Sequence, residues 1–221
     1  MKIEDKKYQN QMISVDVSLF AIKGNKLNVL LVQRNKDPYL GMYSLIGGGV
    51  YNDETCENAV KRELDEKLNI KKITAFLAGV FSDPKRDIRF RNISISYFSL
   101  VNEKDFHYEK NSPKVTGAQW YAMDELPKLA FDHKEILKQS LSNLQEKVYD
   151  IAFIKNFIPT PFSLGGLQKI YESILQTPLD KRNFRRKLNS LDCLKDTGLK
   201  NEHDPRKKSA LYTFKKKNID K

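Results

Sequence analysis

The chain has 221 residues, of which 40% are hydrophobic, so it is long enough to bury the core of one large domain or of two small ones. Its longest apolar runs are far shorter than the roughly 20 residues of a membrane span, and its first residues lack the apolar stretch of a signal peptide, so we expect a cytoplasmic protein without a membrane partner. The two cysteines, Cys56 and Cys193, lie far apart without CxxC spacing, which indicates neither a disulfide framework nor a zinc site.

The net charge of +11 is distributed unevenly along the chain. Residues 151–221 hold 16 Lys and Arg against 7 Asp and Glu, so +9 of the net charge lies there. A small basic module of this kind indicates a polyanionic partner such as nucleic acid. We therefore expect two domains, residues 1–150 and residues 151–221.

The first domain alternates predicted strands and helices. The strands are expected at residues 12–22, 27–34, 73–81, 93–101 and 117–123. The first two flank the turn sequence KGNK and therefore predict a hairpin. A glycine-rich bend leads into a helix that begins at Asp53 or Thr55 and repeats apolar residues every three or four positions up to Leu68. With a second amphipathic helix at 132–149, these elements predict a mixed sheet covered by helices.

The second domain is predicted to be mainly helical. Two prolines in residues 153–162 discourage helix, so this segment is expected to be a linker. Helices follow at 163–175, with Ser163 as the predicted N-cap, and at 177–191. A polar loop then leads into a short strand at 210–217. Helix, turn, helix and basic hairpin within about 60 residues are typical of a winged helix-turn-helix.

The bend and the helix after it carry charged residues at fixed offsets. The series is Gly48, five residues, Glu54, seven residues, then Arg62, Glu63, Leu64 and Glu66. This spacing resembles the Nudix box of nucleoside-diphosphate-linked hydrolases. The resemblance implies an α/β/α sandwich whose box helix presents carboxylates to divalent cations. Glu63, Glu66 and a carboxylate at 67 would share one helical face, which suits Mg²⁺ held against a diphosphate.

Position 67 departs from the family pattern because it is Lys67, and Ile46 and Asn69 replace a usual proline and glycine. A lysine removes an oxygen ligand and adds a like charge, and each unit-charge pair is worth roughly 4 kcal/mol at about 4 Å and an effective dielectric near 20. We therefore expect weak or absent hydrolysis, no required cofactor and only vestigial catalytic roles for Glu63 and Glu66. The alternative is that Lys67 points into solvent and that Glu63 and Glu66 still hold one Mg²⁺.

A hydrolase fold that has lost its metal chemistry but kept its groove can serve as a sensor. Lys67 would then replace part of the positive charge of the ion beside a phosphorylated ligand. The candidate effector-binding residues are Arg34, Gly48, Lys67, Arg86, Arg89 and Arg91. The alternative for each arginine is an ordinary surface position.

The helix at 177–191 is the candidate recognition helix. Phe184, Leu188 and Leu191 are expected to pack inward. The predicted DNA-binding residues of this helix are Lys181, Arg182, Asn183, Arg185, Arg186, Lys187 and Asn189. Arginines reach phosphates and guanine edges, and asparagine addresses adenine. Arg206, Lys207 and Lys208 are expected to contact phosphates from the wing.

Over nearly the whole chain, the degenerate box and the segments FDHKEIL, LQKIYESIL, LDKRNFRRKL and ALYTF resemble the Nudix-related transcription regulators of bacteria. This group includes the NrtR type, which senses ADP-ribose and controls NAD-synthesis genes, and the AraR type, which controls sugar-utilisation genes. The resemblance implies an α+β homodimer that represses transcription, with a Nudix-like domain that senses a nucleotide or sugar effector and a winged helix-turn-helix on double-stranded operator DNA. The alternative is an active Nudix pyrophosphatase for ADP-ribose or nucleoside diphosphates, whose basic domain binds RNA or a partner.

Overall fold

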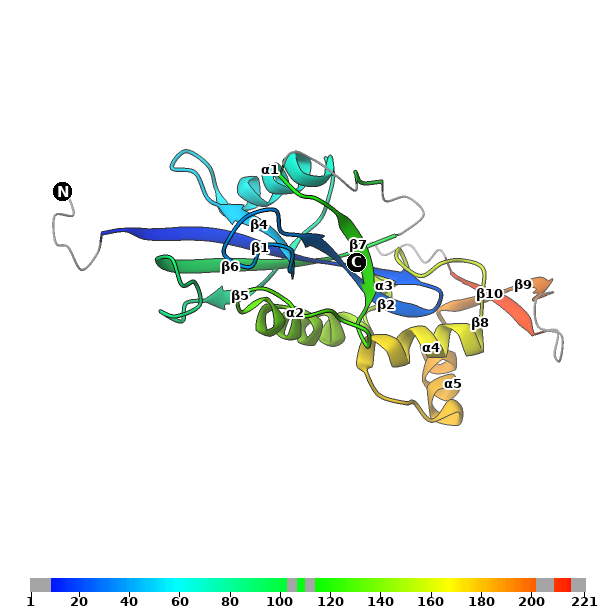
Figure 1. The fold of residues 1–221 in the computed structure, drawn as a ribbon. Coiled ribbons are helices and arrows are strands. Elements are labelled where there is room, and N and C mark those ends of the chain that lie inside the picture. The colour runs from blue at the N-terminus through cyan, green and yellow to red at the C-terminus, as the bar shows by residue number, and fades with distance from the viewer. Residues whose placement is uncertain (1–8, 103–106, 110–113, 202–208, 216–221) are drawn as a thin grey trace.

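The computed structural model describes residues 9–102, 107–109, 114–201 and 209–215, and it contains a large mixed sheet followed by a small one (Figure 1). The large sheet consists of β1 (Gln11–Lys23), β2 (Lys26–Gln33), β3 (Tyr43–Ser44), β4 (Ile46–Gly49), β5 (Phe76–Phe81), β6 (Arg91–Val101) and β7 (Ala118–Ala122). Its central order is β3-β2-β1-β6-β5, with β4 also paired to β1 and β7 to β2. The pair β1–β6 is parallel and the others are antiparallel.

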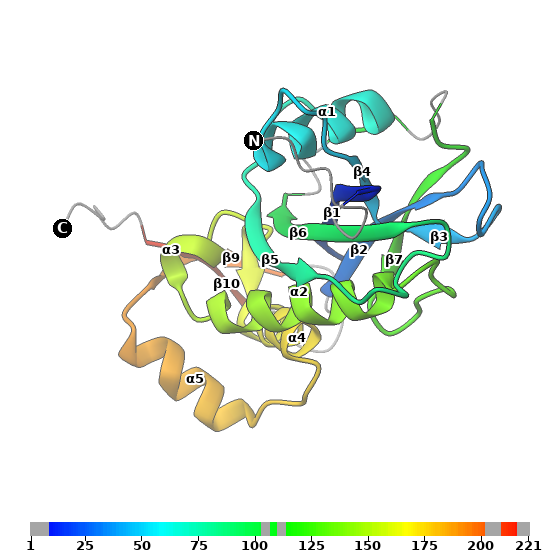
Figure 2. The same ribbon diagram turned by 90° about the vertical axis from the view of Figure 1, so that its left-hand side faces the viewer.

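Two helices, α1 (Cys56–Leu68) and α2 (His133–Lys147), cover opposite faces of this sheet (Figure 2). Strand β1 is buried on both faces because its side chains alternate between the two cores. Val17 and Leu19 pack in the core that includes α1, whereas Phe20 and Ile22 pack in the core that includes α2. The predicted α/β/α sandwich is confirmed.

Helix α1 begins and ends at residues whose side chains suit those positions. Thr55, rather than Asp53, is the N-cap, and its side chain accepts a hydrogen bond from the Asn58 amide at 3.2 Å. Asn69, at the place of the usual glycine, is the C-cap and takes a left-handed φ of 56°, which asparagine tolerates better than most residues. The helix therefore ends normally despite the substitution.

The C-terminal module contains α4 (Leu164–Leu175), α5 (Lys181–Ser190) and a three-stranded sheet in the order β8-β10-β9. Its strands are β8 (Phe162–Ser163), β9 (Leu194–Lys200) and β10 (Ala210–Phe214). Ser163 is the N-cap of α4, as predicted. Strand β9 was not predicted, because its sequence is polar and it forms only by pairing with β10. The predicted winged helix-turn-helix fold of this module is confirmed.

The segment between the two modules is not a solvated linker. It contains the short helix α3 (Ile151–Ile154), and Ile154, Ile158 and Phe162 are buried. These side chains belong to the same hydrophobic core as α2, α4 and α5. The prediction of a linker was wrong because it weighed the two prolines and not the apolar residues on either side of them. No helix in the described part of the chain is long and apolar enough to cross a membrane.

Candidate functional site

A polar cavity of about 240 Å³ opens beside α1 at the glycine-rich strand β4. Its lining joins residues from β1, β4, α1, the loop after β5 and the start of α2. Of the six predicted effector-binding residues, the cavity brings together Arg34, Gly48, Lys67, Arg86 and Arg89. Arg91 does not line it; its guanidinium donates to the Ser82 carbonyl at 2.7 Å. We call this cavity the groove.

The Glu63 carboxylate, which lies against the groove residues Gly48 and Lys67, is held by two cations. Arg62 Nη1 lies 2.6 Å from Glu63 Oε1, and Lys67 Nζ lies 3.0 Å from Glu63 Oε2. Arg62 also contacts Glu54 at 2.6 Å and donates to the Gly49 carbonyl at 2.7 Å, which braces the bend against the helix. These hydrogen bonds to carboxylates hold the pKa of Arg62 above its usual value, with the bond to Glu54 as the largest cause.

Lys67 turns into the groove. Its side chain is only 17% exposed, and Nζ donates to the Gly47 carbonyl as well as pairing with Glu63. The position of the Lys67 side chain therefore contradicts the alternative in which Lys67 points into solvent. A β-carbon at Gly48 would overlap the Glu63 carboxylate, so a larger residue there would displace that carboxylate from its present position.

The arrangement around Glu63 does not fit a divalent cation. Both carboxylate oxygens of Glu63 already pair with Arg62 and Lys67, and Glu66 is turned toward Lys114 and Arg62. Among the residues that the structure describes, no group of three or more Asp, Glu, His or Cys could hold a metal ion. Magnesium prefers several oxygen ligands in octahedral geometry, and here cations occupy those oxygens.

A second buried network lies at the N-terminal end of α2. Arg86 makes a bidentate contact with Asp132, with Nε and Nη2 each 2.8 Å from a carboxylate oxygen. His133 is buried; its Nδ1 accepts the Leu45 amide at 2.9 Å, and its Nε2 lies 3.5 Å from Asp16. Burial lowers the pKa of His133, so the ring is neutral. This network ties the groove to the first turn of α2.

An aromatic ring with two arginines forms the outer wall. Arg34 and Arg89 lie over the Phe131 ring, with guanidinium carbons 4.7 Å and 5.5 Å from its centroid. Phe131 has a φ of +53°, a region that bulky residues seldom adopt and that occurs at functional sites. Arg89 is 43% exposed and pairs with Asp87, whereas the Arg86 side chain is only 3% exposed. Arg34 and Arg89 are thus the more accessible arginines.

Sequence reasoning missed Asp16, Phe131 and His133 as groove residues. Asp16 lies within a strand whose pattern indicates only core, and its carboxylate accepts from Ser94 at 2.6 Å. Phe131 and His133 belong to the FDHKEIL segment, which supported the family resemblance without indicating roles for its residues. A charged residue in the middle of an otherwise apolar strand was the available signal for Asp16.

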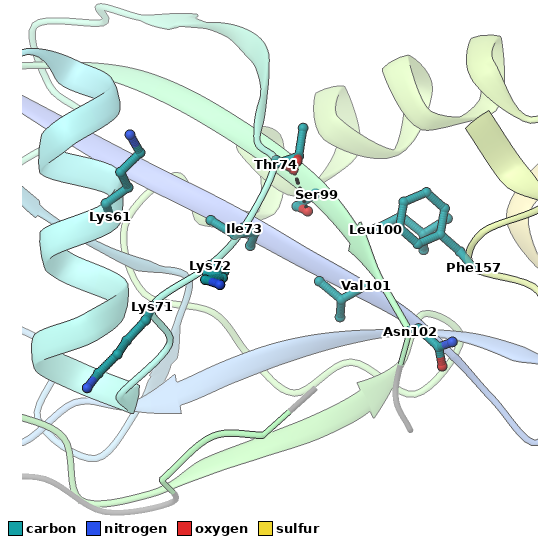
Figure 3. A pocket seen from close by; sticks show the side chains of 10 residues that line it. All are labelled: Lys61, Lys71, Lys72, Ile73, Thr74, Ser99, Leu100, Val101, Asn102 and Phe157. Carbon is teal, nitrogen blue, oxygen red and sulfur yellow. Dashed lines mark hydrogen bonds between the residues drawn. The ribbon is translucent and has the colours of Figure 1, made fainter. Parts of the chain in front are cut away.

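A larger cavity of about 520 Å³ lies at the sheet edge beside α1 and the segment after α3 (Figure 3). Leu100 and Phe157 lie together at one end of it, and the Ser99 hydroxyl donates to the Thr74 carbonyl at 2.8 Å. Its three lysines are exposed, and Figure 3 shows Lys71 extending away from the other lining side chains. It lacks the convergent buried charges of the groove, so we do not assign the effector to it.

Helix α5 presents a basic surface on the C-terminal module. Asp180 is its N-cap, and Phe184 and Leu188 are buried. The residues that share one exposed, concave surface are Lys181, Arg182, Arg185, Arg186 and Asn189, together with Asp180. This surface suits contacts to phosphates and base edges. Asn183 is exposed and accepts from Arg186 at 2.9 Å.

Two features of α5 differ from expectation. Leu191 is 40% exposed, so the prediction that it packs inward was wrong. The helix ends at Ser190, and Leu191 is its C-cap rather than part of its apolar face. Lys187 does not line the basic surface, and its Nζ instead lies 3.2 Å from the centroid of the Tyr149 ring. The predicted wing contacts Arg206, Lys207 and Lys208 lie outside the described residues.

Comparison with known proteins matches both modules to families. Residues 12–140 match the Nudix domain, and residues 154–214 match the NrtR DNA-binding winged helix domain. The ADPR responsive transcriptional repressor NtrR of Acinetobacter baylyi is 29% identical over 96% of this chain and 86% of its own length.

Solved structures of Shewanella oneidensis NrtR match both modules together and the Nudix domain by itself. Shewanella oneidensis NrtR in complex with a 27mer DNA is 31% identical, with a TM-score of 0.70 over 92% of this chain and 93% of that one. The NUDIX domain of the same protein in complex with ADP ribose is 28% identical, with a TM-score of 0.57 over 64% of this chain and 94% of that one. The chain therefore belongs to the NrtR-type transcriptional regulators, in which a Nudix domain is followed by a DNA-binding winged helix.

Proposed function

We propose that this protein is a repressor that binds operator DNA through α5 and changes its DNA affinity when ADP-ribose, or a closely related metabolite, occupies the groove. The observation that carries the proposal is that Lys67 stands at the position of a metal-ligand carboxylate and pairs with Glu63, so the described residues of the groove present cations where a metal would be held. The relatives bound to DNA and to ADP-ribose support the two partners. We further propose a cytoplasmic homodimer that controls genes of NAD metabolism.

The chemistry of the groove supports a diphosphate ligand. Arg34, Lys67 and Arg89 supply positive charge near Phe131, whose ring is suited to contact a nucleobase or ribose. Arg86 is different, because Asp132 and Asp16 neutralise it and it is nearly buried. We assign to Arg86 the role of fixing the start of α2 rather than of binding phosphate directly.

Binding in this groove needs no divalent cation, and hydrolysis is weak or absent. Nudix chemistry depends on carboxylates that hold a metal, and here Glu63 and Glu66 pair with cationic side chains. Lys67 Nζ supplies a single fixed charge, which can contact one phosphate oxygen but cannot bridge two as a metal does. Glu63 therefore acts as a structural support of Lys67 in the ligand-binding groove, Gly48 leaves room for the Glu63 carboxylate, and Glu66 pairs with Lys114 and Arg62.

The proposed DNA binding depends on how a dimer would position its two copies of α5. Two recognition helices entering successive major grooves must lie about 34 Å apart, so a small rotation between protomers can disrupt both contacts. The Nudix domain and the winged module share one hydrophobic core, so a movement in the Nudix domain would also move α5. Analytical ultracentrifugation tests the dimer.

The function as a whole is tested by measuring linkage. Operator affinity is measured by fluorescence anisotropy with and without saturating ADP-ribose, and ADP-ribose affinity by calorimetry with and without operator. We expect the two experiments to give the same fold-change, because coupling between two sites is reciprocal, and typical couplings of about 1–3 kcal/mol correspond to roughly 5- to 150-fold. Equal ADP-ribose affinities with and without operator would show that the groove is not the sensor.

The alternative function, an active pyrophosphatase, is addressed by assaying turnover of ADP-ribose with Mg²⁺ or Mn²⁺. Hydrolysis at rates typical of enzymes, on the order of 1 per second or faster, would contradict the proposal. Operator binding does not exclude this activity, so both assays are required.

A further inference from the structure

The recognition helix is attached to the Nudix domain by a contact at its exposed side. Lys187 of α5 places Nζ 3.2 Å from the centroid of the Tyr149 ring, just beyond the end of α2. Tyr149 is 36% exposed and Lys187 is also exposed, so the contact can open without disturbing the core. A lysine placed over an aromatic face is attracted by the ring quadrupole.

Beneath this contact, a row of rings joins the same elements. The ring centroids of Tyr149 and Tyr171 are 5.7 Å apart, and those of Tyr171 and Phe184 are 5.2 Å apart. Tyr171 is 1% exposed, and its hydroxyl has no hydrogen-bond partner among the residues that the structure describes. The end of α2, the helix α4 and the recognition helix α5 therefore meet through ring packing.

The opposite end of α2 forms part of the groove. Asp132 and His133, at its first turn, hold Arg86 and the Leu45 amide, respectively. Its last turn is tied to α4 by Gln145, whose Nε2 donates to the Ile174 carbonyl at 2.9 Å. Fifteen residues at 1.5 Å each make α2 a rod of about 22 Å. His133 at its start lines the groove, and its other end lies beside α4 (Figure 1).

We propose that Lys187 and Tyr149 form a latch through which α2 positions the recognition helix, so that Lys187 is a positioning residue and not a phosphate contact. This inference rests on the proposed function, since the latch matters only if the groove regulates DNA binding. It separates Lys187 from the five residues of the basic surface, which lie on a different side of the helix.

The existence of the latch is tested without DNA or effector. Unfolding of the full chain is compared among wild type, Tyr149→Leu, Lys187→Ala and the double variant. Leucine keeps apolar packing against Tyr171 but removes the aromatic face. We expect coupling of about two- to five-fold in the unfolding equilibrium constant, the range that an exposed cation–π contact supports, and the double variant should lose less than the sum of the singles. Additive effects would overturn the latch.

Its role is tested by the response to ADP-ribose. We expect Tyr149→Leu and Lys187→Ala each to reduce the effector-induced fold-change in operator affinity by about two- to five-fold, and Lys187→Arg to retain the wild-type response because a guanidinium also stacks on a ring. Lys181→Ala is the matched control, since it removes the same charge from the same helix without a ring contact. It should weaken binding to every DNA and leave the response ratio intact.

Two other outcomes are distinguishable. A wild-type response that persists unchanged in Tyr149→Leu would overturn the latch and leave the proposed function standing. Lys187→Ala could instead lose affinity equally for every DNA sequence, with the slope of log affinity against log salt concentration reduced by about one. That result would also overturn the latch and show that Lys187 contacts a phosphate. If wild type itself shows no response to ADP-ribose, the proposed function fails and the regulatory role of the latch fails with it.

Discussion

Replacing Lys67 by glutamate removes one of the two cations that hold Glu63 and adds another carboxylate to the groove face of α1. The Lys67 and Glu63 side chains are 17% and 7% exposed, so their pair is largely shielded from water. Breaking a buried pair by removing one partner costs about 3–5 kcal/mol. Arg62 remains on Glu63, which places the expected loss at the lower end, about 3 kcal/mol.

This loss predicts a measurable change in melting temperature and a new response to magnesium. For a domain of 150–250 residues, 1 kcal/mol shifts the melting temperature by about 2–4 °C, so metal-free Lys67→Glu should melt about 6–12 °C below wild type. In this variant, three clustered carboxylates can hold Mg²⁺. Mg²⁺ at 100 times its Kd would stabilise the folded variant by about 2.7 kcal/mol, which recovers most of the lost free energy of unfolding.

The assay is differential scanning fluorimetry with EDTA or Mg²⁺, combined with calorimetric titration of ADP-ribose under the same two conditions. Lys61→Glu is the matched control, because it makes the same charge change on an exposed position of α1 outside the groove. We expect wild-type affinity for ADP-ribose to be the same in EDTA and in Mg²⁺. Loss of wild-type binding in EDTA, or equal stabilisation of Lys61→Glu and Lys67→Glu by Mg²⁺, would refute the assignment of Lys67 as the built-in cation.

Three further predictions concern base reading, packing and pH. If Arg185 contacts a base edge, Arg185→Ala should weaken binding to the operator by about 1–3 kcal/mol and binding to random DNA much less, as measured by fluorescence anisotropy. An equal loss of affinity on every DNA sequence would instead assign Arg185 to a phosphate contact. Phe184→Ala should lower the free energy of unfolding by about 3–5 kcal/mol in denaturant titrations, because Phe184 is 5% exposed within the core shared by both modules; a loss below about 1 kcal/mol would contradict that packing. Burial lowers the pKa of His133 below its usual 6.5, so the folded state resists protonation and the free energy of unfolding should fall as the pH drops below about 6.5. His133→Gln should remove this part of the pH dependence. Parallel pH profiles of the variant and the wild type would contradict the prediction.

Local sequence signals predicted the longer helices and strands of both modules and the nature of each module. Apolar residues at helical spacing predicted α1, α2, α4 and α5, and Ser163 indicated where α4 begins. The Nudix box spacing and the basic recognition helix were readable because each depends on residues close together in the chain. Cap and periodicity signals act over one or two turns, which is why they survive without tertiary information.

Only the tertiary structure decided what the functional side chains contact. Lys67 faces the groove because the Gly47 carbonyl and Glu63 receive it, and Gly47 is twenty residues away in sequence. Lys187 lies over the Tyr149 ring, just beyond the end of α2, a contact that its position on a basic helix did not indicate. A long, flexible cationic side chain is free to take any nearby partner, and the partners of a lysine are brought close only when segments distant in the chain pack together.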